Sequence, residues 1–567
     1  MKKPADLAFG VDERPPTSVI WLAALQHVGV LALVMVFPLL VSRAAGASPA
    51  IAGQILSAGM LALGLATIAQ ARARGPIGSG YLAPTGFQAV YLGPSLVAAQ
   101  AGGLPLVFGM TIFSGAVEAT LSRVWRPLRA YLPPELSGLV VLFTGLAVMA
   151  IGVRYLMAGS DGHPVSLVGW TVAGFTLAIM IGLNLWTRGM LRMFCALNGL
   201  IAGYVLAVVL GLGSAAELAA IGDMPFLALP RFDHLAWSFD LTMVVPFAVA
   251  GIAAALNTSA NVTIYQRLND TEWVRPDIQS IGRGTLTDGL GASISGALGS
   301  CGISTLSASV GVIMATGVAA RVIAYAIGAI VFALAFLPKF TAVLVATPTP
   351  VVAGALIFIG CFILIGGMQI ITSRMLDARK SLVIGLSVTA ALAVIMFPSV
   401  TVSAPTWLRP LLGSALVTGT VLAFILNLLF RLGVRQKVAL TLDSAGDYPQ
   451  AIEDFFTQRG KAWGARPDII RRVIFGVTQL AEAVIENCNP AGPLVIDATF
   501  DEYNLEVHVS YEGDLLELPD ARPTEREVRE EDDGARRLAG YMLRRNADRA
   551  QSVHRDGRAV IHFHFDH

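Results

Sequence analysis

The chain has 567 residues, of which 55% are hydrophobic and only 14% are charged. Soluble proteins of this length carry about a quarter charged residues, so the composition excludes a wholly water-soluble globular protein. The formal net charge of +1 gives no sign of a nucleic-acid partner, and we expect none.

Long apolar runs recur from Val19 to Phe430, and they can cross the roughly 30 Å hydrocarbon layer as helices. We predict an all-α membrane fold of about 14 transmembrane segments, two of them short and interrupted by glycine. The first run is too long for a signal peptide, so we expect an uncleaved span after a cytoplasmic segment of residues 1–18. Lys and Arg gather in the loops of one side, which predicts a plasma (bacterial inner) membrane protein with both ends in the cytoplasm.

The first span carries His27 within "LQHVGV". An ionisable residue inside a membrane is a functional candidate by default, so we treat His27 as a functional candidate. The alternative is a histidine that only packs between helices.

The two halves of the membrane part resemble each other. "GSGYLAPTG" begins at Gly78, and "GSCGISTLS" begins at Gly299, at the same distance from the start of its half. Because an odd number of segments per half inverts the second half, we predict two inverted seven-segment repeats, residues 19–238 and 239–434.

Glycine breaks are tolerated in a membrane only where protein or water satisfies the freed backbone. We therefore predict that the two broken segments face each other across a cavity that holds a polar ligand. Tyr81, with its neighbour Leu82, is placed to stack on a flat ring, while Ser307 and Ser309 offer hydroxyls. The alternative is that these hydroxyls bond back to their own helices.

The stretch "GIAAALNTSANVTIYQRLND" places Asn257, Asn261 and Tyr265 on one helix face. In a cavity, the two amides could read the edge of an uncharged heterocycle. The alternative is an amide clasp between helices.

Two further carboxylates lie well inside predicted spans. Asp288 in "TLTDGLG" is a second functional candidate. Glu118 in "GAVEATLSR" is expected to pair with Arg123 near the cytoplasmic end of its span. The four cysteines show no metal-ligand spacing, and no metal site is predicted.

Residues of about 15–432 resemble the nucleobase–cation symporters, the uracil/xanthine permease and nucleobase–ascorbate transporter family. The resemblance rests on "LQH", "GSGYLAP", "LPPELSGLVVLFTGL", "LNGLIAGYVLAVVLG", "RGTLTDGLGASISGALG" and "SVGVIMATGVAARV". It implies a core domain and a gate domain, with substrate held by the third, eighth and tenth segments. It also implies transport of a purine or pyrimidine with H⁺ or Na⁺, often by a homodimer.

The sequence departs from that family at its main site. Where the family has E-x-x-G-D in the eighth segment, this chain runs from Asn257 to Asn261, and the Glu or Gln and Asn of the tenth are Ala308 and Ser309. An amide cannot titrate, so His27 and Asp288 remain as coupling candidates. An anionic substrate is the alternative, by analogy with the sulfate/anion transporter fold.

Residues 435–567 are charged and alternating, which predicts a cytoplasmic α/β domain. We expect helices near 447–459, 466–488 and 535–548, and strands at 493–500, 504–511 and 558–565. The order resembles a GHKL (histidine-kinase-type) ATPase domain. Its nucleotide motifs are poor: Glu482 and Asn487 are the remaining nucleotide candidates, and ATP is not expected. "HFHFDH" is expected to form the polar face of a strand rather than a metal site.

Together with what the resemblance implies, these patterns predict a secondary active transporter of a nucleobase or related heterocycle that works by alternating access. The C-terminal domain is expected to regulate or dimerise it. The alternatives are an anion or carboxylate transporter or channel, and a membrane transceptor that signals through the C-terminal domain. The expected partners are a small-molecule substrate, the lipid bilayer, a second copy and a cytoplasmic regulatory protein. No enzyme chemistry is expected, and no cofactor beyond the coupling ion.

Overall fold

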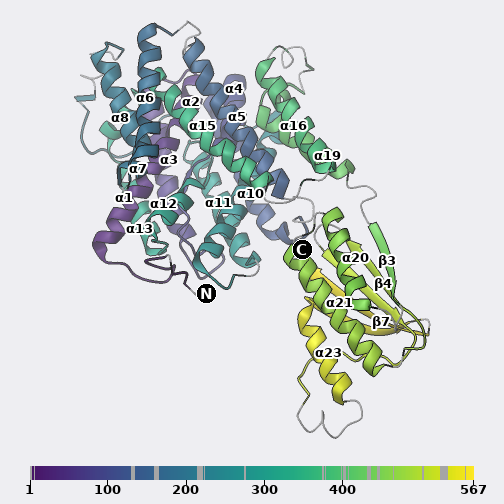
Figure 1. The fold of residues 1–567 in the computed structure, drawn as a ribbon. Coiled ribbons are helices and arrows are strands. Elements are labelled where there is room, and N and C mark those ends of the chain that lie inside the picture. Colours follow the sequence, from purple (N-terminus) through teal and green to yellow (C-terminus); the bar gives the residue numbers. More distant parts are fainter. Residues whose placement is uncertain are drawn as a thin grey trace. The chain divides into compact units, whose positions relative to one another are not determined.

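The computed structural model describes the chain except at residues 1–2, 6, 129–133, 159–164, 189, 213–220, 223, 274–275, 373–375, 377, 398, 400–403, 406–407, 431–435, 443–446, 464, 466, 489, 501–503, 524–533, 556 and 567. It forms two compact units (Figure 1). The helical unit comprises Met1–Ile371 and Val383–Ile425, and the sheet unit comprises Thr372–Leu382 and Leu426–His567. The predicted domain boundary at 434/435 lies outside the described residues.

The first half of the membrane part contains eight helices and one short strand within its described residues. They are α1 (Thr17–Val34), α2 (Val36–Ala44), α3 (Pro49–Gln70), β1 (Thr85–Phe87), α4 (Ala89–Leu128), α5 (Pro134–Ala158), α6 (Leu167–Trp186), α7 (Met190–Met193) and α8 (Cys195–Val209).

The second half repeats this arrangement of helices around a short strand. Its described elements are η1 (Leu241–Met243), α10 (Val244–Asn269), α11 (Ile278–Ala297), β2 (Ile303–Thr305), α12 (Ala308–Thr316), α13 (Val322–Leu334), α14 (Pro338–Val345), α15 (Thr349–Ile371), α16 (Ala378–Met396), α18 (Arg409–Leu412) and α19 (Ala415–Phe430).

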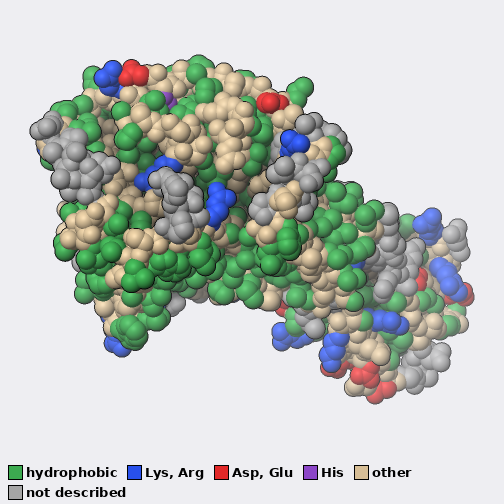
Figure 2. Space-filling view, turned by 90° about the horizontal axis from the view of Figure 1, so that it is seen from above, with side chains coloured by type: hydrophobic (Ala, Val, Ile, Leu, Met, Phe, Trp, Pro, Cys, Tyr) green, Lys and Arg blue, Asp and Glu red, His purple; other side chains and the backbone are tan. Residues whose placement is uncertain are grey.

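The helices have the length and composition of membrane spans. Among the described residues, eight helices are long and apolar enough to cross a bilayer, or up to nine if the bent pair α13 and α14 forms one span. Figure 2 shows hydrophobic side chains over much of the visible surface. Large exposed hydrophobic residues include Trp186, Leu241 and Met396, which a soluble surface would rarely gather in such numbers. The chain is a multi-pass membrane protein.

Helix α4 supplies more than one of the predicted segments. At 40 residues it would be about 60 Å long if straight, twice the hydrocarbon thickness. Gly103 within it has φ 70°, a left-handed conformation that a regular helix cannot accommodate. The predicted number of segments is therefore larger than the number of long helices.

The two halves form matching contacts. Helix α3 of the first half packs on α13 of the second, and α11 packs on α4 in the corresponding way. Glycine allows both approaches: a Cβ at Gly64 would lie 2.8 Å from the Gly328 carbonyl oxygen, and one at Gly289 would lie 2.6 Å from that of Gly115. Helix α5 packs along its counterpart α15. These exchanged contacts confirm the predicted repeats.

The N-terminal segment folds back onto the loop between α12 and α13. Phe9 donates to the Gly317 carbonyl at 3.1 Å, and Ala319 donates to the Phe9 carbonyl at 2.8 Å. The Arg321 side chain then pairs with Asp12. We call residues 9–12 the N-terminal strap.

The sheet unit contains one antiparallel five-stranded sheet with strand order β3-β4-β5-β7-β6. The strands are β3 (Gln436–Leu442), β4 (Leu494–Phe500), β5 (Asn504–Tyr511), β6 (Arg549–Arg555) and β7 (Arg558–Asp566). Helices α20 (Tyr448–Trp463), α21 (Pro467–Asn487) and α23 (Gly534–Asn546) accompany the sheet (Figure 1). The predicted helices and three predicted strands are confirmed; β3 and β6 were not predicted.

Candidate functional site

Two glycine-rich breaks lead into the short strands at the centre of the helical unit. Gly78 has φ 95° and Gly299 has φ 77°, conformations that L side chains rarely adopt. The segments that follow meet as an antiparallel pair, in which Thr85 lies opposite Thr305 and Phe87 opposite Ile303. The segments that follow the two breaks therefore pair directly, and each strand satisfies the backbone of the other; the cavity expected between them stays a prediction.

Asp288 on α11 anchors strand β2. Its Oδ2 accepts hydrogen bonds from the Ser304 hydroxyl at 2.7 Å and from the Thr305 main-chain N–H at 2.8 Å. The Thr258 hydroxyl of α10 donates to the same oxygen. Asp288 is fully buried, and hydrogen bonds of this kind are what make a buried carboxylate tolerable.

In the first repeat, an uncharged side chain takes the place of the Asp288 carboxylate and accepts the hydrogen bond from the N–H of strand β1. The N–H of Thr85 on β1 donates to Oγ1 of Thr67 on α3 at 3.1 Å. Thr67 and Asp288 therefore occupy equivalent places, one beneath each strand. The carboxylate makes the second repeat's contact charge-assisted, and it makes that contact sensitive to protonation.

Three amide side chains converge on one main-chain oxygen. Asn257 donates to the Thr305 carbonyl at 2.9 Å and Asn261 at 3.2 Å, both from α10. Gln88, which follows β1, donates to the same carbonyl at 3.1 Å. A carbonyl oxygen has two lone pairs, so the three donors share them.

The accessible side of this cluster lies at the start of α12. The Ser307 hydroxyl donates to Oδ1 of Asn257 at 3.0 Å, and both Ser307 and Ala308 are exposed. Ser309 is buried, and its hydroxyl has no hydrogen-bond partner among the described residues. The predicted residues Asn257, Asn261 and Ser307 are thus brought together, with Ala308 beside them.

Three other predicted residues lie elsewhere in the core. Tyr81 and Leu82 are buried in the hydrophobic cluster that surrounds β1. His27 is buried on α1, and its Nδ1 has no hydrogen-bond partner in the described part of the chain. Tyr81 and Leu82 are therefore both buried, and their predicted contact with a ligand stays a prediction.

The predicted pairing of Glu118 with Arg123 is wrong. Glu118 is fully buried on α4, and its Oε2 accepts a hydrogen bond from the Tyr91 hydroxyl at 3.2 Å. The Tyr91 ring in turn lies against the backbone that leads into β2, where a Cβ at Gly302 would be 2.2 Å from the ring. The helical face of Glu118 points inward, so the exposed Arg123 is not its partner.

Sequence reasoning missed two glutamines of the site. Gln88 shares the Thr305 carbonyl, and Gln70 at the end of α3 donates to the Gly284 carbonyl at 2.9 Å and approaches Asp288 Oδ1 at 3.5 Å. Oε1 of Gln70 also accepts from the Ser79 N–H at 3.2 Å. Their positions in the sequence could have identified them, because each glutamine lies at the end of a helix or strand next to a predicted break.

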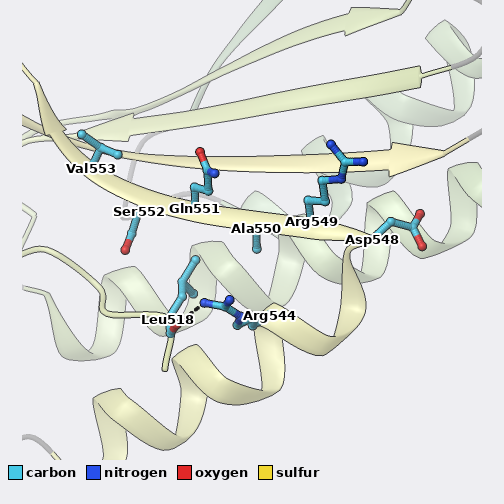
Figure 3. A pocket seen from close by; sticks show the side chains of 8 residues that line it. All are labelled: Leu518, Arg544, Asp548, Arg549, Ala550, Gln551, Ser552 and Val553. Carbon is cyan, nitrogen blue, oxygen red and sulfur yellow. Dashed lines mark hydrogen bonds between the residues drawn. The ribbon is translucent and has the colours of Figure 1, made fainter. Parts of the chain in front are cut away.

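The two nucleotide candidates of the sheet unit lie along α21. Asn487 donates to the Ala483 carbonyl of its own helix at 3.1 Å, and Gln479 donates to Oε2 of Glu482 at 3.0 Å. A groove of about 540 Å³ lies elsewhere, between α23 and β6 (Figure 3). There Arg544 donates to the Leu518 carbonyl at 2.8 Å. The candidates do not line this groove.

The chain has recognisable relatives. Residues 19–400 match the model of the Permease family (Xan_ur_permease). The chain is 29% identical to the "Putative purine permease CPE0397" of Clostridium perfringens over 74% of this chain and 92% of the relative. It is 28% identical to "Xanthine permease XanP" of Escherichia coli over 75% and 95%. It is 24% identical to "Uric acid permease PucJ" of Bacillus subtilis over 74% and 94%.

Solved transporter structures also resemble the chain. The transmembrane domain of the cyanobacterial bicarbonate transporter BicA aligns with a TM-score of 0.47 and 16% identity, covering 74% of this chain and all of that domain. Murine Slc26a9 aligns with a TM-score of 0.49 and 13% identity, covering 77% and 72%.

Proposed function

Because the chain belongs to the Permease family, whose model spans most of its membrane part, we propose that it carries a nucleobase across the membrane. The substrate is a purine or pyrimidine of the xanthine or uracil kind, or a related small heterocycle. The names of its relatives, a purine, a xanthine and a uric acid permease, support a purine most directly.

The observation that carries this proposal is that both main-chain polar groups of Thr305 are hydrogen-bonded by side chains of the candidate site. Its N–H donates to Asp288, while its carbonyl accepts from Asn257 and Asn261. A nucleobase presents alternating N–H and C=O groups along its edge. Amides can satisfy both kinds of group, since each has a donor and an acceptor.

In this proposal the substrate enters at the Asn257–Ser307 hydrogen bond. Ser307 is exposed, and its bond to Asn257 is replaceable by a ligand of matching polarity. The bound substrate then forms hydrogen bonds with the Asn257 amide and the Ser307 hydroxyl, which bond to each other when no substrate is present. Buried polar groups left without a partner are costly, so this exchange selects a ligand with the complementary pattern.

Transport is coupled to a proton through Asp288, with His27 as the second candidate and Na⁺ as the alternative ion. Protonation of Asp288 removes the charge that Ser304 and Thr305 now satisfy, and so loosens β2. The two inverted repeats then alternate in opening the site to either side. Both chain ends face the cytoplasm, and the sheet unit regulates or dimerises the transporter.

The test is uptake of labelled xanthine, uric acid and uracil by cells that lack their own nucleobase permeases. Expression of this chain should raise the uptake of at least one, and unlabelled purine should compete whereas bicarbonate and sulfate should not. Uptake of a small anion with no response to any nucleobase would overturn the proposal. Ligand binding without flux would instead support the transceptor.

A further inference from the structure

The sheet of the sheet unit has two unlike faces. On β5 and β7 the residues Leu505, Val507, Ile561 and Phe563 are buried in a hydrophobic core with residues of α20 and α21. The alternate residues therefore point to the opposite face. They are partly exposed, and they include three histidines and a glutamate.

Four of these alternate residues form a square on the two central strands. Register places His508 of β5 opposite His562 of β7, and Glu506 opposite His564. The ligand atoms of Glu506, His508 and His562 all lie within 4.8 Å of one another. Nδ1 of His564 lies 3.9 Å from Oε1 of Glu506 at the fourth corner.

Two histidines of the square stack on each other, and one of their ring nitrogens lacks a hydrogen bond. The rings of His508 and His562 are stacked, with centroids 4.3 Å apart and planes 10° apart. Nε2 of His562 is buried and has no hydrogen-bond partner among the described residues. A buried imidazole nitrogen without a partner calls for a donor or a metal ion.

We propose that Glu506, His508 and His562 bind a divalent first-row transition metal ion of the Zn²⁺ class, on the face of the sheet that the helices leave open. Two imidazoles and one carboxylate are a donor set that zinc uses, with a fourth position left for water or another ligand. His564 lies on the same face beside Glu506, with its Nδ1 3.9 Å from Oε1 of Glu506. Hard ions such as Mg²⁺ and Ca²⁺ prefer oxygen ligands and are poor fits.

Binding requires the two stacked imidazole rings to turn out of their parallel arrangement, because the lone pair of each ring nitrogen lies in the plane of its ring. Ligand atoms on a tetrahedral zinc lie about 3.3 Å apart, given metal–ligand distances of about 2.0 Å. The present separations of up to 4.8 Å close by rotation about the side-chain torsions, because the Cα positions are already fixed by the strand register. The ion then joins the two central strands of the sheet, β5 and β7.

The test uses the full-length protein, purified through a tag without histidine, stripped with EDTA and dialysed. Titration with ZnCl₂ followed by calorimetry should give one ion per chain. His508→Ala and His562→Ala should each weaken binding at least about tenfold. His554→Ala is the matched control, because this histidine lies on β6 with its Nδ1 bonded to the Arg558 carbonyl, and its variant should bind as the wild type does.

A second measurement keeps the proposal open to refutation if a variant misfolds. Co²⁺ bound to the wild-type protein should give the intense visible bands of four-coordinate nitrogen and oxygen ligation, and Glu506→Gln should change them. Failure of the wild type to bind Zn²⁺, or undiminished binding in the His508→Ala/His562→Ala double variant, would overturn the proposal. Nucleobase uptake plays no part in either readout.

Discussion

The main-chain N–H of Thr305 donates to the Asp288 carboxylate at 2.8 Å, which ties strand β2 to helix α11 inside the membrane. The carbonyl of the same threonine holds two asparagines of α10. Any change in the charge of Asp288 therefore acts on the residue that positions the proposed substrate contacts.

Asp288→Asn should abolish proton-dependent accumulation of the substrate while leaving binding measurable. The amide keeps the size of the side chain, but it cannot titrate, and hydrogen bonds to a charged group are worth about 1.5–3 kcal/mol. The measurement is uptake at several external pH values, where the variant should have a flat profile and the wild type should not.

Asp277→Asn is the matched control, since Asp277 lies on the same chain segment but caps α11 by accepting from the Gln279 N–H at 2.9 Å. It should cost no more than about 1 kcal/mol of stability and keep the pH profile. A pH profile that survives in Asp288→Asn would assign coupling elsewhere, with His27 next in line.

Asn257→Ala should remove most substrate binding. It deletes the donor to Thr305 and the acceptor for Ser307, and an amide contact of this kind is worth about 0.5–1.5 kcal/mol, roughly a two- to thirteenfold loss in affinity. Ligand-induced thermal stabilisation reports it. Asn269→Ala, which removes a buried amide bonded within its own helix, should leave the response intact. Equal losses in both variants would mean that helix stability, not recognition, is being measured.

Gly302→Ala should destabilise the helical unit by about 1–3 kcal/mol, because the added Cβ would lie 2.2 Å from the Tyr91 ring. Gly311→Ala is the comparison on α12, where a Cβ meets nothing within 4 Å and alanine favours the helix. The unfolding temperatures in detergent should fall for the first variant alone. Equal values would show that β2 is loosely packed on Tyr91.

Asp12→Ala should loosen the N-terminal strap. Exposed Asp12 pairs with the mostly covered Arg321 side chain, and a surface pair of this kind is worth about 0.4–1 kcal/mol, so local opening should rise about two- to fivefold. Chymotrypsin cleavage after Phe9 measures that opening. Asp233→Ala removes another exposed pair, with Arg231, and should not change the cleavage rate at Phe9. An unchanged cleavage rate in Asp12→Ala would mean that the backbone hydrogen bonds, rather than the ion pair, hold the N-terminal strap in place.

Sequence patterns predicted the breaks and the repeats because glycine and proline mark backbone that cannot be helical. They predicted Asn257 and Asp288 because polar groups are conspicuous in apolar runs. They could not predict that the Thr305 carbonyl would accept hydrogen bonds from Asn257, Asn261 and Gln88. Every residue has a carbonyl group, and the pairing of β1 with β2 decides which carbonyl these side chains can reach. Glu118 was misassigned because a nearby arginine in sequence says nothing of which way the helix face points. Strand β6 was missed because "RAQSVHR" is a polar edge without apolar alternation.

The pairing of β1 with β2 has a consequence for how the protein is made. Gln88 and its acceptor Thr305 are 217 residues apart, and synthesis at about 5–20 residues per second separates them by on the order of ten to forty seconds. During that interval the backbone of β1 has no partner strand, and hydrocarbon cannot replace one. The nascent first repeat must therefore wait in a wet or protein-lined place until the second emerges. Slower release of the first repeat into lipid should therefore aid assembly, and faster release should yield misfolded chains.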